Sequence, residues 1–103
     1  MPADHTKRSL HQRLVDRVLQ GPGEAPSDLR ARAFANAELP EALHPLLDKV
    51  ASSSAQVTDA DFAAALEAGF TEDQLFELVV CAAAGESTRQ YEAGLAALDG
   101  AAQ

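Results

Sequence analysis

Residues 57–85 encode two helix starts and the turn between them, and this stretch constrains the fold more than any other part of the chain. Thr58 is a good N-cap residue, because its hydroxyl can accept a hydrogen bond from a free N–H in the first helical turn. Val57 and Phe62 flank it at the two positions of a hydrophobic staple. Thr71 repeats the same pattern further along. Two helices joined by a tight corner are therefore expected here.

The corner itself is also encoded locally. Gly69 suits the left-handed position that follows the last residue of a helix. Phe70 and Leu75 form a second staple around Thr71, and Gln74 completes a capping box. The sequence predicts that one helix ends at Gly69 and the next begins just after Thr71.

The second of these helices is predicted to be the central one. From Leu75 to Ala84 the only polar residue is Glu77, so a helix here is apolar on nearly every side and should lie inside a bundle. The preceding helix has ordinary amphipathic spacing and should cover it with one face, made of Phe62, Ala65, Leu66 and Gly69.

The remaining patterns are helical too, and no strand alternation occurs. We expect a first helix over 6–20, a second over 27–36 and a third after Pro40. Pro45 would clash inside that third helix, which predicts a single turn and then a helix starting near Pro45, or a kink. Ser87 can cap a last helix over 88–98. The expected fold is an all-α bundle of about six helices.

The length of 103 residues predicts a single domain over 1–103. We place N-terminal helices in 1–39, the core in 40–98 and a flexible tail in 99–103. Such a chain buries roughly 60 to 70% of its unfolded surface. Aromatic residues make up only 5% and alanine dominates, so the core must come from close helix approach. That core is thin for a monomer, and we predict a homo-oligomer that completes it across a subunit interface.

The net charge of −8 is unevenly distributed. Residues 1–32 carry six basic and four acidic side chains, and residues 33–103 carry two basic and twelve acidic ones. Solvated helix faces together with charge complementarity within the chain are the simpler explanation of this asymmetry, and electrostatic docking between subunits is the alternative. The acidic majority argues against binding nucleic acid, which requires a basic surface.

Cys81 is the only cysteine, so an intrachain disulfide is impossible. The N-terminus lacks an apolar signal segment, and the longest apolar run, 78–84, is far shorter than the roughly 20 residues that span a bilayer. The expectation is a cytoplasmic protein without a membrane partner.

The stretch AGFTEDQLFELVVCAAAG at 68–85 resembles the carboxymuconolactone decarboxylase and AhpD-like superfamily. The resemblance covers roughly residues 43–98 and implies an all-helical bundle that usually oligomerises. This resemblance implies comparison with AhpD-type members, which carry a Cys-x-x-Cys-x-x-x-His motif on the helix just before this corner. In this chain the three positions fall on Ser54, Val57 and Asp61, so the thiol chemistry of that branch is not carried over. Asp61 is better explained as a capping residue in the first turn of its helix than as a proton relay.

Four residues remain as catalytic candidates: Glu77, His44, Asp48 and Cys81. His44 and Asp48 are spaced i, i+4 and could act as a base and its orienting carboxylate, although a surface contact is the simpler interpretation. Burial would raise the pKa of Glu77 unless Arg89 or a helix-end N–H reaches it. Cys81 lies among apolar residues, which favours an inert core thiol over a reactive one.

No metal or cofactor site is expected, because His5 and His11 show no metal-ligand spacing. The leading hypothesis is a redox-inactive, AhpD-like, non-catalytic oligomeric accessory or protein-interaction subunit. The competing hypothesis is a cofactor-free acid–base enzyme, of decarboxylase or isomerase type, acting on a small carboxylated substrate through Glu77, His44 and Asp48. A thiol peroxidase component acting through Cys81 is the weaker alternative.

Overall fold

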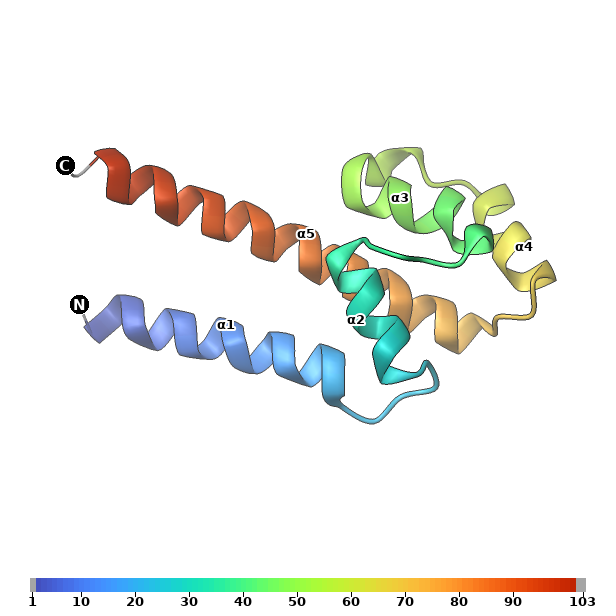
Figure 1. Cartoon of the computed structure of the whole chain (residues 1–103), viewed down its shortest axis with the longest axis horizontal. Helices are drawn as coiled ribbons and strands as arrows, with labels where there is room; N and C mark the ends of the chain where they lie inside the picture. The colour runs from blue at the N-terminus through green and yellow to red at the C-terminus, as the bar shows by residue number, and fades with distance from the viewer. Residues whose placement is uncertain (1, 102–103) are drawn as a thin grey trace.

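The computed structural model describes the backbone of residues 2–101 and the side chains of residues 9–101. Within that range every regular element is helical, as predicted. There are five α-helices, α1 (Pro2–Gln20), α2 (Ser27–Ala35), α3 (His44–Ser52), α4 (Asp59–Glu67) and α5 (Glu72–Ala101), and two 3-10 turns, η1 (Glu41–Leu43) and η2 (Ser54–Gln56). Figure 1 shows α2, α3 and α4 gathered around the first half of α5.

Both predicted helix starts of the 57–85 stretch are confirmed, since α4 begins at Asp59, directly after Thr58, and α5 begins at Glu72, directly after Thr71. Thr71 Oγ1 accepts the N–H of Gln74 at 3.1 Å, and the Gln74 amide oxygen accepts the N–H of Thr71 at 3.0 Å. Gly69 has φ +106°, in the left-handed region, and its N–H donates to Leu66 O at 3.0 Å. The corner between α4 and α5 is therefore fixed by contacts within a few residues of chain.

Pro45 has the effect expected of it. The single turn η1 comes first, and α3 then begins at His44 with Pro45 in its first turn, where a missing N–H costs nothing. Ser53, the short turn η2 and then Val57 and Thr58 lead to α4.

The core lies where α2 and α3 pack on the first half of α5. Leu43, Leu46, Leu47, Leu75 and Leu78 are its largest fully buried apolar side chains. Small residues set the crossing of α2 and α5: Ala33 and Ala82 are buried, and Gly85 lies so close to α2 that a Cβ there would stand 2.7 Å from Phe34 C and closer still to its oxygen. The predicted close approach of helices is confirmed at this point.

Two helical arms extend from this core. We use the name for α1 and for residues 86–101 of α5, which run antiparallel and leave both chain termini at the same end of the molecule (Figure 1). The radius of gyration is 15.4 Å, compared with about 13 Å for a compact domain of this length. From Ser9 to Gln20 and from residue 86 to 101 no side chain is fully buried.

Several expectations about element boundaries were wrong. α1 begins at Pro2 instead of residue 6. α5 runs unbroken to Ala101, so no separate helix starts at Ser87, and Asp99–Ala101 are helical where a flexible tail was expected. The Thr88 hydroxyl bonds back to Ala84 O at 2.8 Å inside the helix, so this hydroxyl takes part in the continuous helix.

The expectation that the central helix is enclosed on all sides was also wrong. Phe76 is 70% exposed and Val80 37% exposed, and on α4 Leu66 is 41% exposed. α2 and α3 cover one side of α5, and α4 contacts it only near the corner, so one apolar face remains open. None of the described helices is both long and apolar enough to cross a membrane.

Candidate functional site

His44 and Asp48 do share a face at the start of α3. His44 Nδ1 lies 3.0 Å from Asp48 Oδ2, and His44 Nε2 lies 3.1 Å from the carbonyl oxygen of Leu39. Both partners only accept hydrogen bonds, so both contacts are hydrogen bonds at the same time only when both ring nitrogens carry a proton. The hydrogen bond to Asp48 accordingly raises the pKa of His44. A histidine with both nitrogens engaged has no free lone pair with which to act as a base.

Glu77 ties α5 to the connection between α1 and α2. Its carboxylate accepts the backbone N–H of Glu24 at 2.8 and 2.9 Å and that of Ala25 at 3.0 Å. Arg89, the side-chain partner considered from the sequence, instead donates to Phe34 O at 2.8 Å and pairs with Glu86 at 3.2 Å. Glu77 thus anchors a loop that enters α2.

Cys81 is buried, one turn after Glu77 on α5. Desolvation raises the pKa of its thiol, and Sγ lies 3.7 Å from Val18 O, to which it can donate a weak hydrogen bond. Burial and a raised pKa are what an unreactive core thiol requires.

Arg30 is also buried and donates to Gly21 O at 2.7 Å and to Val18 O at 3.3 Å, so it caps the end of α1.

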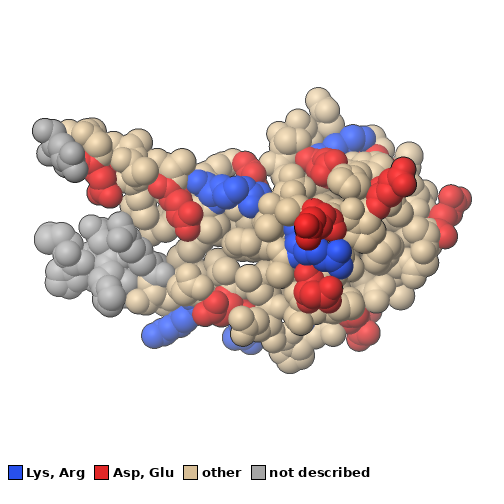
Figure 2. All heavy atoms as spheres, viewed as in Figure 1, with Lys and Arg blue, Asp and Glu red and all other residues tan. Residues whose placement is uncertain are grey.

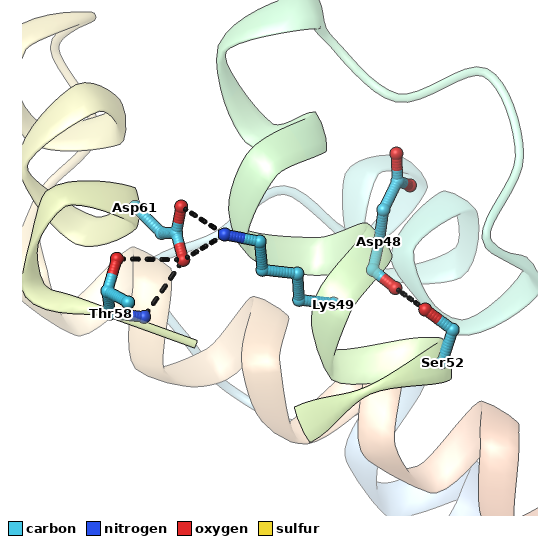
Figure 3. A network of polar contacts seen from close by, with 5 residues as sticks. All are labelled: Asp48, Lys49, Ser52, Thr58 and Asp61. Carbon is cyan, nitrogen blue, oxygen red and sulfur yellow. Dashed lines mark hydrogen bonds and ion pairs between the residues drawn. The ribbon is translucent and has the colours of Figure 1, made fainter. Parts of the chain in front are cut away.

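Asp61 lies at the start of α4, within a second polar cluster (Figure 3). Lys49 Nζ reaches from α3 to both carboxylate oxygens of Asp61 at 3.0 Å, and the N–H of Thr58 donates to Oδ2 at 2.9 Å. The hydrogen bonds from Thr58 and then from Lys49 lower the pKa of Asp61. The capping role expected for Asp61 is confirmed, and the ion pair to α3 adds a tertiary contact that local spacing could not reveal.

The positions matched to the AhpD-type motif do not share a helix. Ser54 lies in η2, Val57 lies in the extended segment after it, and Asp61 lies in α4. No described side chain at these positions can form a disulfide or supply a thiolate.

The catalytic candidates form two separate groups. Within the described residues, no hydrogen bond or ion pair joins His44 or Asp48 to Glu77 or Cys81. None of the four lines the two hollows described below. Residues 9–101 also contain no cluster of three His, Cys, Asp or Glu side chains placed to hold a metal ion. The side chain of His5 lies outside the described residues.

Two apolar surface features stand out instead. The first, which we call the α4–α5 groove, is a hollow of about 460 Å³ with five apolar lining residues and two acidic ones, namely Phe62, Leu66, Leu75, Phe76, Val79, Glu72 and Asp73. It lies at the corner between the two helices, at the end of the molecule opposite the arms (Figure 1).

The second feature is a set of exposed leucines on the arms. Leu10 and Leu14 on α1 are 53% and 64% exposed, and Leu98 on α5 is 68% exposed. A hollow of about 390 Å³ lies between the arms, where His11 stacks on Tyr91 with ring centroids 4.8 Å apart. His11 Nε2 also lies 3.0 Å from Thr88 Oγ1, so His11 joins the arms through a polar contact and a stacking contact.

Helical spacing puts Leu10 and Leu14 on the apolar stripe of the first helix, and Phe76 belongs to the helix that was expected to be enclosed. The sequence therefore predicts inward positions for all three side chains, whereas the structure leaves them exposed. The low aromatic content and the predicted thin core were the only signals that some faces would lack a partner within one chain.

Comparisons of the chain with protein-family models, with curated proteins and with solved structures gave no match. The similarity of residues 68–85 to the AhpD-like superfamily therefore stays a prediction based on the sequence.

Proposed function

We propose that this protein is a non-catalytic, homo-oligomeric interaction subunit that self-associates through its two arms. The supporting observation is that three leucines of the arms are more than half exposed. Large apolar side chains exposed together on one part of a small protein are typical of an interaction site. We further propose that the chain is a redox-inactive relative of AhpD-like proteins, which is supported by residues 68–85 and by the buried state of Cys81.

The geometry of the arms favours a second copy of the chain as the partner. Two antiparallel helices form half of a four-helix bundle, and a two-fold axis would supply the other half. The charges agree with this arrangement. α1 carries four basic and two acidic residues, whereas residues 86–101 carry three acidic residues and one basic residue. In a symmetric pair, α1 of one copy can pack on α5 of the other with opposite charges facing each other.

The candidate catalytic residues support the non-catalytic part of the proposal. His44 has no free ring nitrogen, Glu77 is bound by three backbone hydrogen bonds, and Cys81 is buried with a raised pKa. Each has a structural role that is satisfied within the chain. No structural observation favours the acid–base enzyme or the peroxidase alternative.

Sedimentation velocity over a wide concentration range tests the proposal. The wild type should sediment as a dimer at micromolar concentration. Completing the burial of Leu14, now 64% exposed, contributes about 1 to 2 kcal/mol per copy. Leu14 occurs twice in a symmetric interface, so Leu14→Ala should raise the dimer dissociation constant on the order of 30- to 1,000-fold.

The matched control is Phe76→Ser, which changes an equally exposed apolar residue at the other end of the molecule and should leave the dimer intact. A wild-type protein that stays monomeric at about 100 µM, a concentration at which even a weak dimer would form, would contradict self-association. A dimer that Leu14→Ala and Leu98→Ala leave unchanged would show that the arms are not the interface.

A further inference from the structure

The α4–α5 groove combines an exposed aromatic side chain with apolar residues that are less exposed. Phe76 is 70% exposed and Leu66 41% exposed, and the buried Leu75 also lines the groove. Phe76 projects from the second turn of α5, and Leu66 lies in the last turn of α4. The helix caps on either side of Gly69 hold the two walls, so the groove exists without a ligand.

The chain segment that contains the groove residues is acidic and has no basic residue. Residues 50–88 include seven Asp or Glu residues and no Lys or Arg. Two of the acids have partners, since Asp61 pairs with Lys49 and Glu77 binds backbone N–H groups. Glu72 and Asp73 line the groove itself. In Figure 2 acidic atoms mark the outer edge of this end of the molecule.

We infer that the α4–α5 groove binds a basic amphipathic helix of a partner protein, with apolar side chains placed against Phe76 and Leu66 and Lys or Arg placed against Glu72 and Asp73. A groove between two helices suits an α-helix whose anchors recur at i and i+3 or i+4. The acidic rim selects a cationic ligand, because opposite charges speed association and like charges exclude other partners.

The same charges argue against the other occupants of an apolar groove. Two copies of this groove facing each other would oppose Glu72 and Asp73 of both chains. An anionic membrane surface would be repelled in the same way. The surface is also distinct from the arms, so it would remain open in the dimer proposed above.

Fluorescence anisotropy with the full-length protein provides the test. The probe is a labelled helical peptide of about 15 residues, long enough for four turns, made of Leu on one face and Lys on the other. A matched peptide with Glu in place of Lys is the ligand control. Binding of the Lys peptide should weaken at least tenfold in Phe76→Ser and should weaken, with a smaller salt dependence, in the double variant Glu72→Gln, Asp73→Asn.

Leu98→Ser is the matched protein control. Leu98 is 68% exposed on the α5 arm, at the other end of the molecule from the groove, so its substitution should leave the peptide affinity unchanged. Phe76 lies mostly in solvent, so Phe76→Ser should retain the wild-type circular dichroism spectrum and melting temperature. ¹⁵N–¹H spectra should show the largest peptide-induced shifts in residues 62–79.

Several results would overturn the inference. These are equal affinity for the Glu peptide, loss of binding in Leu98→Ser, no effect of Phe76→Ser, or no binding of the Lys peptide. A change in oligomeric state caused by Phe76→Ser would identify a second copy as the occupant. Binding of phosphatidylglycerol or phosphatidylcholine vesicles that requires Phe76 would identify a lipid surface. Because self-association depends on Leu14 and peptide binding on Phe76, failure of one proposal is distinguishable from failure of the other.

Discussion

Replacing Gly85 with alanine should destabilise the protein, even though alanine is the better helix former. Gly85 lies inside α5 where α2 crosses it, and an added Cβ would stand 2.7 Å from Phe34 C and 3.0 Å from Phe34 Cα. These are backbone atoms, so no side-chain rotation relieves the clash. Phe34 O is also held by Arg89 Nη1 at 2.8 Å, which opposes a shift of the end of α2.

Two opposing effects decide the magnitude. Alanine in a helix interior is favoured over glycine by about 1 kcal/mol. Overpacking a close-packed site costs about 1 to 3 kcal/mol, and a backbone clash belongs at the upper end of that range. We therefore expect Gly85→Ala to lower the free energy of unfolding by about 1 to 2 kcal/mol net. For a chain of this size the melting temperature would fall by roughly 4 to 15 °C.

Gly94→Ala is the matched control on the same helix. No atom lies within 4 Å of a Cβ built at Gly94, so only the helix preference acts and the variant should gain up to about 1 kcal/mol. Urea denaturation followed by circular dichroism, at one fixed protein concentration, measures both variants. Equal stabilisation by the two substitutions would refute the close approach of α2 and α5 and the argument that small residues set this crossing.

Three further outcomes are expected. The Cys81 thiol should react with a thiol reagent far more slowly in the native protein than in the unfolded one, because it is buried and its pKa is raised; native reactivity matching that of the denatured chain would contradict the inert assignment. Glu77→Ala should lower the free energy of unfolding by about 2 to 3 kcal/mol, since it leaves the N–H groups of Glu24 and Ala25 without their charged acceptor; unchanged urea unfolding would exclude the anchoring role. The folded-state pKa of Asp61 is lowered, so its stabilisation is present above the ordinary value of 3.8 and is lost as the pH falls through the lower folded value. Asp61→Asn should therefore be less stable than the wild type at pH 6 and converge with it in acid, and a difference that persists at the lowest pH would show that charge is not the cause.

The sequence by itself determined the helix boundaries that depend on a few neighbouring residues. Thr71 with Gln74, the left-handed Gly69 and Pro45 at the start of α3 all act within one turn of chain, so their effects follow directly from spacing. The all-helical class follows for the same reason. Even the structural use of Asp61 in the first turn of α4 was legible at this level.

Only the tertiary structure decided how the helices share their apolar faces. Ser87 could have started a new helix, but α5 continues through it and packs α2 against Gly85. Phe76 and Leu14 have the same hydrophobicity whether they point into a core or into a groove, and no local rule separates the two cases. Which faces remain open depends on how many helices surround α5, and that count is a property of the whole chain and of its partners.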